Sequence, residues 1–159
     1  MKNALVLFAH GARDPRWAAP FEKLRDIART QLPDTDVSLA FLELMSPRLP
    51  EVVARLAGEG CTRLSVVPVF LGQGGHVLRD LPLLIDELRS NHPGLEISVA
   101  AAVGEDSEVL GAIARYCVAA AASPSGAGSG GRVALGRGSL LRKVRSGSGF
   151  KGGRVCGCR

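Results

Sequence analysis

Apolar residues follow two alternating patterns along the first 122 positions of the chain. Short continuous apolar runs, bounded by turn residues, predict β-strands at residues 4–9, 37–42, 64–71 and 95–103. After each run, apolar residues recur every three or four positions, which predicts amphipathic helices at residues 16–31, 47–57, 78–90 and 106–122. Ser46 is expected to be the N-cap of the second helix, with Pro47 in its first turn.

Strands and helices that alternate in this way predict an α/β fold with a four-stranded parallel sheet. Right-handed crossovers between parallel strands place helices on both faces of such a sheet. We expect the strand order 2-1-3-4, which puts the first strand in the middle. The third apolar run is almost unbroken, so it predicts a strand that is covered on both faces.

The last 37 residues, 123–159, have a different composition from the rest. They contain eight Lys or Arg, no Asp or Glu, and eleven of the twenty glycines. This segment shows no apolar periodicity and is expected to be a disordered basic tail after an α/β domain at residues 1–122. It is either a natural appendage or the product of a reading-frame shift, and its lack of any structural pattern favours the frameshift.

The basic character of the whole chain comes largely from this tail. The net charge is +5 overall, but residues 1–122 contain 12 basic and 15 acidic side chains, which gives about −3. We therefore expect no nucleic-acid partner. No apolar stretch approaches the roughly 20 residues of a membrane helix, and no signal-peptide pattern is present, so the expectation is a cytoplasmic protein without membrane contact.

The cysteines do not form a pattern typical of a disulfide framework. Cys61 and Cys117 are far apart in the predicted domain, and Cys156 and Cys158 lie in the tail. The tail pair alone is weak support for a metal site.

Three residues with metal-binding side chains follow predicted strands at equal intervals. From His10 to Glu43 and from Glu43 to His76 there are 33 residues each, about the length of one strand-helix repeat. If the strands lie side by side, all three side chains emerge at the carboxyl edge of the sheet, where open α/β sheets bind ligands. Two imidazoles and a carboxylate suit a divalent transition metal. His92, by contrast, precedes Pro93 at a helix C-terminus, and we interpret it as structural.

The segments around these residues offer ways to hold an anionic ligand. Gly74 and Gly75 allow the chain to pass close to a large ligand, and the helix that follows has unpaired N–H groups at its start. The glycine pattern lacks the third glycine of a dinucleotide-binding fingerprint. Arg13 and Arg16, after the first strand, are placed to meet carboxylates at the same edge.

These motifs together resemble the sirohydrochlorin chelatases of the CbiX type. The resemblance covers about residues 2–122 and is carried by the segments LFAHGARD at 7–14, FLE at 41–43 with Pro47, PVFL at 68–71, and GGHV at 74–77 with DLP at 80–82. It implies a chelatase-like fold with flavodoxin-like topology. It also implies insertion of Co²⁺ or Fe²⁺, and in some members Ni²⁺, into sirohydrochlorin in cobalamin or sirohaem biosynthesis, without ATP or an organic cofactor.

By matching positions, the resemblance assigns metal handling and proton acceptance to His10 and His76, with assistance from Glu43. Arg13, Gly74 and Gly75 would contact the tetrapyrrole. Short members of the family carry one copy of the domain and pair as homodimers, whereas long members carry two copies. The chain is therefore expected to form a homodimer, or to be the first half of a long enzyme.

Two other functions remain as alternatives. The chain could be a metal-binding or metal-delivery module that keeps the ligands but inserts no metal. A nucleotide-binding flavodoxin-like domain is a weaker alternative, because the glycine pattern is incomplete.

Overall fold

The structure is a computed structural model that describes residues 2–72 and 74–122, apart from the side chains of His76, Val77 and Leu78. The expectation of a disordered tail concerns residues 123–159, which lie outside the described part of the chain.

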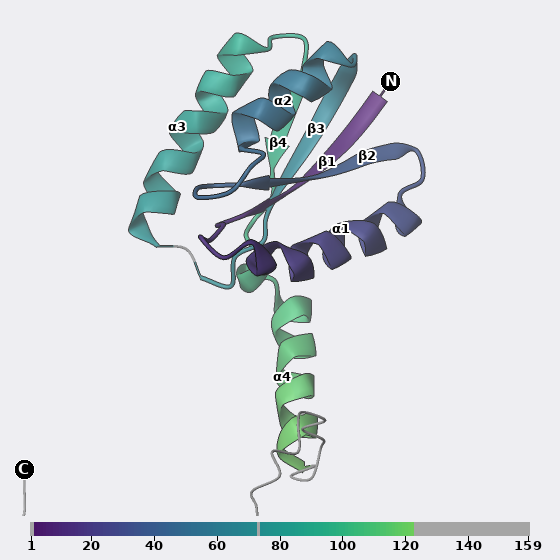
Figure 1. Ribbon diagram of the computed structural model, residues 1–159, viewed down its shortest axis with the longest axis vertical. Helices are drawn as coiled ribbons and strands as arrows, with labels where there is room; N and C mark the ends of the chain where they lie inside the picture. Colours follow the sequence, from purple (N-terminus) through teal and green to yellow (C-terminus); the bar gives the residue numbers. More distant parts are fainter. Residues whose placement is uncertain (1, 73, 123–159) are drawn as a thin grey trace, which may run out of the picture. The chain divides into compact units, whose positions relative to one another are not determined.

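The described residues form a parallel four-stranded sheet and the helices that connect its strands (Figure 1). The strands are β1 (Lys2–Ala9), β2 (Thr35–Phe41), β3 (Cys61–Pro68) and β4 (Glu96–Val99). The α-helices are α1 (Ala19–Gln31), α2 (Leu49–Gly58), α3 (Gly75–Asn91) and α4 (Ser107–Ala122), and the 3-10 helices are η1 (Pro15–Ala18) and η2 (Val103–Glu105). The strand order is β2-β1-β3-β4, which confirms the predicted 2-1-3-4 order.

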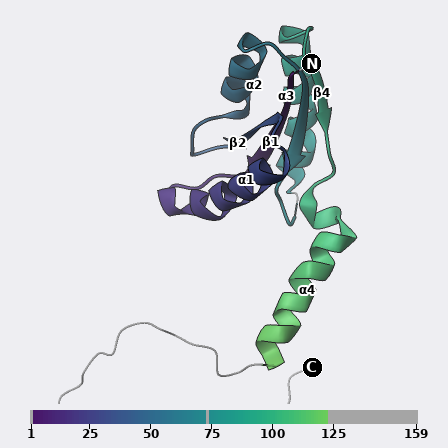
Figure 2. The same ribbon diagram turned by 90° about the vertical axis from the view of Figure 1, so that its right-hand side faces the viewer.

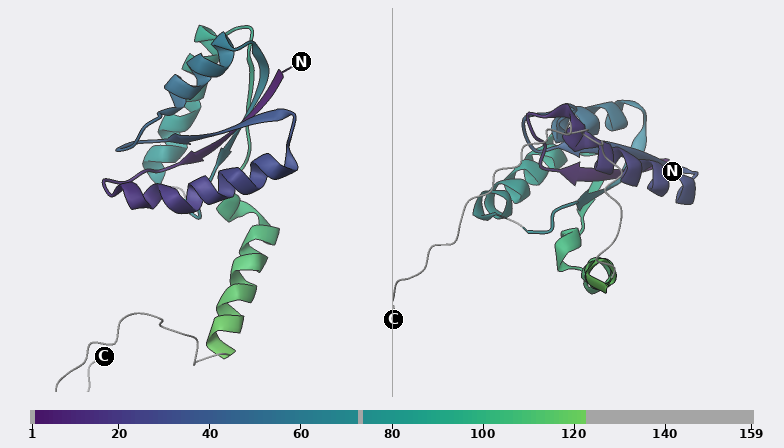
Figure 3. Two further views of the ribbon diagram at one scale, coloured as in Figure 1. Left: turned by 45° about the vertical axis from the view of Figure 1, so that its right-hand side comes forward. Right: turned by 60° about the horizontal axis from the view of Figure 1, so that its bottom comes forward.

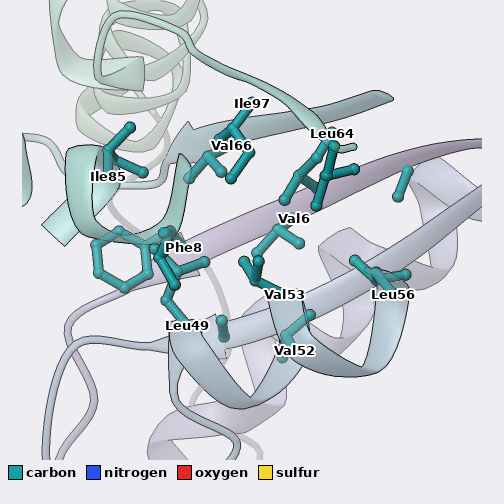
Figure 4. Packing of buried hydrophobic residues seen from close by; sticks show 14 of the residues in the cluster. Val6, Phe8, Leu49, Val52, Val53, Leu56, Leu64, Val66, Ile85 and Ile97 are labelled. Atoms are coloured by element: carbon teal, nitrogen blue, oxygen red, sulfur yellow. The ribbon is translucent and has the colours of Figure 1, made fainter. Parts of the chain in front are cut away.

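The larger hydrophobic core lies between one face of the sheet and the helices α2 and α3 (Figure 4). Val6 and Phe8 of the central strand β1 are completely buried there. Val53 and Leu56 of α2 are equally buried, and Ile85 belongs to the same cluster from α3. Each such side chain contributes about 1.5–3 kcal/mol when it leaves water, so this face anchors the strands in their order.

Helix α1 covers the opposite face over β1 and β2, so helices lie on both faces as predicted (Figure 3). Phe21 of α1 packs against a smaller cluster that includes Leu7, Leu39 and Phe41. No residue of α1 is itself buried. This side of the sheet is therefore the thinner of the two layers.

The same face is polar over β3 and β4. Arg63 Nε lies 3.1 Å from the Glu96 carboxylate, and the Ser65 and Ser98 hydroxyls are 3.3 Å apart. The prediction that the third strand is covered on both faces is thus wrong. The strand begins at Cys61, because it pairs with β1 from Lys2 onward, and this pairing brings polar residues into the sheet.

The second helix begins later than predicted. Arg48, not Ser46, is the N-cap of α2, and its backbone N–H donates to the Glu51 carboxylate over 2.9 Å. The reason lies in the preceding loop, where the Phe41 N–H donates to the Pro47 carbonyl over 2.9 Å. This bond holds Pro47 beside the end of β2, so the helix starts two residues farther on.

The boundaries of α3 and β4 also differ from the prediction. Helix α3 begins at Gly75, three residues early, which places the backbone of His76 in the first helical turn. Strand β4 ends at Val99 and the chain then enters η2, where the Gly104 N–H donates to the Phe70 carbonyl over 2.9 Å. That bond ties the segment after β4 to the end of β3.

At each outer strand of the sheet, an arginine side chain occupies one backbone carbonyl. Arg29 of α1 donates from Nε to the Val37 carbonyl of β2 over 2.9 Å, and Arg89 of α3 donates from Nη2 to the Ile97 carbonyl of β4 over 2.9 Å. Unpaired edge groups invite pairing with another chain. The two arginines occupy edge acceptors and so oppose extension of the sheet.

Helix α4 directly follows η2, and none of its residues is buried (Figure 2). Leu110 and Ile113 are 46% and 39% exposed, and Cys117 is exposed as well. These residues recur at spacings of three and four, so they form an apolar stripe on one side of α4. Among the described residues, no helix is both long and apolar enough to cross a membrane.

Candidate functional site

The backbones of His10 and Glu43 lie side by side at the carboxyl edge of the sheet. The hydrogen bonds between β1 and β2 continue past both strands: the Leu42 N–H donates to the Ala9 carbonyl over 2.8 Å, and the Glu43 N–H donates to the His10 carbonyl over 3.0 Å. The Glu43 side chain is exposed, and that of His10 is half-buried. Two of the three predicted site residues therefore meet at this carboxyl edge, which we call the rim.

Gly11 makes this close approach possible. Its φ is +91°, in the left-handed region that favours glycine. A Cβ on Gly11 would come within 2.0 Å of the Glu43 carbonyl oxygen. The residue after His10 thus has to be glycine if the two loops are to keep their contact.

The loop that follows Glu43 is tight. Leu44 has a φ of +62°, an uncommon value for a residue other than glycine, and the Met45 N–H donates to the Glu43 carbonyl over 2.8 Å. Backbone strain of this kind often occurs at functional sites. Here the turn leaves the Glu43 carboxylate in solvent at the rim.

His76 reaches the same edge through the chain that follows β3. The Val69 N–H donates to the Phe8 carbonyl over 2.8 Å, so the end of β3 stays beside that of β1. The backbone of His76 begins α3 soon afterwards. Its side chain lies outside the described residues, and the described side chains contain no group of three histidine, cysteine or acidic residues placed to hold a metal ion. The role of His76 as a third ligand stays a prediction.

Of the two arginines that follow His10, only Arg13 lacks a partner among the described residues. Arg16 Nη2 lies 2.6 Å from the Asp14 carboxylate, and this contact lowers the pKa of Asp14 below its ordinary value. Asp14 also accepts a hydrogen bond from the Arg16 backbone over 2.9 Å and so starts η1. Arg16 is held in this local pair, whereas the exposed Arg13 keeps its guanidinium available.

Arg48 is a rim residue that the sequence analysis missed. Its guanidinium is exposed and has no hydrogen-bond or ion-pair partner in the described part of the chain. Its backbone bridges to Phe41 at the end of β2, which places it at the carboxyl edge. The signal was available in the sequence, because Arg48 follows the same strand as Glu43.

Phe70 is a second residue that the sequence analysis missed. Its ring lies against the His10 imidazole, with the ring centroids 4.2 Å apart. In the sequence, Phe70 is one residue in an apolar run and is indistinguishable from a residue of the core. Spacing could not reveal the contact, because it depends on how β1 and β3 are paired.

Gly74 and Gly75 lie at the start of α3, and both are exposed. A Cβ at either position would meet no atom within 4 Å among the described residues, so packing does not require glycine there. His92 is the C-cap of α3, at the opposite end of that helix from His76. This position agrees with a structural role for His92.

A family model and individual relatives of known name all relate this chain to the same group of proteins. The model of the CbiX family matches residues 4–119. A sirohydrochlorin cobaltochelatase of Methanocaldococcus jannaschii is 35% identical over 90 residues, which are 57% of this chain and 63% of the relative. A sirohydrochlorin ferrochelatase of Bacillus subtilis is 26% identical over 113 residues, or 71% of this chain and 43% of the relative. The matches span less than two thirds of both relatives.

Two solved structures share the fold. The CbiX protein of Marinobacter aquaeolei VT8 superposes with a TM-score of 0.68 at 33% identity, covering 77% of this chain and 99% of the other. The sirohydrochlorin chelatase SirB from Bacillus subtilis subspecies spizizenii, in complex with cobalt, gives a TM-score of 0.65 at 25% identity. That match covers 75% of this chain but only 51% of SirB, so one α/β unit corresponds to half of the SirB chain.

Replacing Gly11 with Ala is expected to destabilise the protein by at least about 2 kcal/mol, because the new Cβ demands both an unfavourable φ and displacement of the Glu43 carbonyl. Urea unfolding measures the difference. The matched control is Gly58→Ala in α2, where a Cβ meets no described atom within 4 Å and the midpoint should stay or rise. Equal midpoints for Gly11→Ala and the wild type would refute the close approach of the two loops.

Proposed function

Because the chain belongs to the CbiX family, we propose that it is a chelatase that inserts a divalent metal ion into sirohydrochlorin. Relatives named sirohydrochlorin cobaltochelatase and ferrochelatase support Co²⁺ and Fe²⁺ as the metal substrates. Ni²⁺ accepts the same nitrogen and oxygen ligands and is included in the proposal. The observation that best supports the chelatase proposal is the backbone hydrogen bond that holds His10 beside Glu43 at the carboxyl edge.

The proposed ligands are His10, Glu43 and His76. Imidazole nitrogen and carboxylate oxygen bind borderline metals such as Co²⁺ and Fe²⁺. A set without thiolate holds the ion loosely enough to pass it to the macrocycle. The exposed Glu43 and the half-buried His10 leave the rim open to a large flat substrate.

The same residues can handle the protons of the reaction. As a divalent ion enters the macrocycle, two pyrrole N–H protons have to leave. Neutral imidazole accepts a proton near pH 7, so His10 and His76 can act as bases while Glu43 assists. No nucleotide or organic cofactor takes part in the proposed reaction.

The carboxylates of sirohydrochlorin are proposed to meet Arg13. Its guanidinium is exposed at the rim and has no partner among the described residues. Guanidinium groups bind carboxylates with two parallel hydrogen bonds. The space beside Gly74 and Gly75 is the proposed approach for the face of the macrocycle, since no described side chain lies within 4 Å of a Cβ placed at either position.

We further propose that two copies of the chain form a homodimer whose two rims face one cleft. The described residues contain one α/β unit, whereas SirB is twice as long as the region that matches this chain. A second copy would supply the other half of the cleft. Arg29 and Arg89 each occupy a carbonyl on an outer strand, which opposes extension of the sheet, so the copies are expected to pair through another surface.

The apolar stripe of α4 is the proposed surface for this pairing. Leu110, Ile113 and Cys117 lie on one side of the helix and are exposed, although apolar side chains gathered on one face favour burial. Contact with a second copy would bury them.

The chelatase proposal is tested with the purified full-length chain, sirohydrochlorin and Co²⁺, by following the absorption spectrum. The wild type is expected to accelerate insertion over the spontaneous rate. His10→Ala should lower the catalysed rate at least about 100-fold and Glu43→Gln at least about tenfold, because each removes a ligand or base. His92→Ala, at the far end of α3, is the matched control and should keep the wild-type rate.

A wild-type rate equal to the spontaneous one would contradict the proposal. If Co²⁺ still bound under those conditions, the protein would be a metal-binding module without insertion activity.

The dimer is tested by light scattering after size-exclusion chromatography. The wild type is expected to have twice the chain mass, and Ile113→Lys should raise the dissociation constant at least tenfold, because it brings a charge into the apolar contact. Arg115→Gln on the same helix is the control and should remain dimeric. A monomeric wild type at all concentrations, or an unchanged dissociation constant for Ile113→Lys, would refute pairing through α4.

A further inference from the structure

We propose that Phe70 is a positioning residue whose ring holds the His10 imidazole in one orientation. This inference rests on the proposed function, in which His10 handles the metal. It adds to the site a residue that lies two positions after the end of β3, and it assigns that residue a role other than packing.

The two rings are in direct contact. Their centroids are 4.2 Å apart and their planes are inclined by 33°, so the ring of Phe70 covers one face of the imidazole. Phe8 lies behind Phe70 at 5.7 Å, with an inclination of 59°. Aromatic pairs at such distances attract each other beyond the effect of burial alone.

Phe70 is itself fixed in place. It is only 2% exposed, although the next residue, Leu71, is 66% exposed. Its backbone carbonyl accepts a hydrogen bond from Gly104 of η2 over 2.9 Å. A Cβ on Gly104 would lie 2.1 Å from the Leu71 carbonyl oxygen, so the backbone of η2 is in close contact with the backbone next to Phe70. A side chain held this firmly can fix the orientation of its neighbour.

The imidazole of His10 needs such a partner. A histidine that binds a metal is usually oriented by a hydrogen bond from its other ring nitrogen to a carboxylate, carbonyl or water. The His10 side chain makes no hydrogen bond to another described residue. The contact with Phe70 restricts rotation of the ring instead. It covers a face, whereas both nitrogens lie on the ring edge and stay free to bind a metal.

The experiment compares Phe70→Leu with Phe8→Leu in the full-length chain. Both changes remove a buried ring, but of the two only Phe70 forms a ring pair with His10 among the described residues. Carbon-13 labelled histidine gives the ring signals by NMR, and the His10 signal is identified by its loss in His10→Ala. Binding of Co²⁺ alone is measured by calorimetry.

Phe70→Leu is expected to remove the upfield ring-current shift of the His10 ring protons and to weaken Co²⁺ binding about three- to tenfold. Phe8→Leu should lower stability but retain most of the shift and the wild-type Co²⁺ affinity. Phe70→Met, with a flexible side chain of similar size, replaces Phe70→Leu if that variant does not fold.

Unchanged His10 shifts and unchanged Co²⁺ affinity in Phe70→Leu would overturn the positioning role, as would equal effects of the two phenylalanine substitutions. If the proposed chelatase function is wrong, the same experiments give a different result. In that case His10→Ala would bind Co²⁺ as tightly as the wild type, while Phe70→Leu would still shift the ring signals.

Discussion

The parallel pairing of β1 with β2 on one side and β3 on the other is the constraint on which the rest of the structure depends. It brings the carboxyl ends of three strands to one level, and the hydrogen bond from the Glu43 N–H to the His10 carbonyl extends that alignment beyond the strands. A shift of one residue in either pairing would turn every side chain to the opposite face. His10 and Glu43 meet because the buried residues of β1, such as Val6 and Phe8, fix this register.

The two faces of the sheet contribute unequally to that alignment. Helices α2 and α3 bury the larger core on one face, whereas α1 covers only β1 and β2 on the other. The exposed Arg63–Glu96 pair marks the part of the second face that no described helix covers. Because the larger core lies on one face and the proposed site residues His10, Glu43 and His76 lie beyond the strand ends, substitutions at those three positions would leave that core filled.

Much of this arrangement was predictable from the sequence. The apolar runs located the strands, and the equal intervals between His10, Glu43 and His76 indicated a shared edge. The start of α2 was not predictable, because it depends on a hydrogen bond from Phe41 to Pro47 that joins a strand to a loop. The contact of Phe70 with His10 was not predictable either, since an aromatic residue within an apolar run gives no indication of which distant segment it contacts. For His76 the sequence predicted the edge, and the role of its side chain remains a prediction.

We propose that one metal ion is held at the carboxyl edge by His10 and Glu43, from the loops after β1 and β2, and by His76, from the first turn of α3. Crystals of the full-length chain grown with Co²⁺, with diffraction data collected at the cobalt absorption edge, test it most directly. The expected result is an anomalous peak within about 2.0–2.2 Å of an imidazole nitrogen of His10, a carboxylate oxygen of Glu43 and an imidazole nitrogen of His76. A cobalt peak bound elsewhere, such as at Cys156 and Cys158, with no cobalt at the rim, would contradict it.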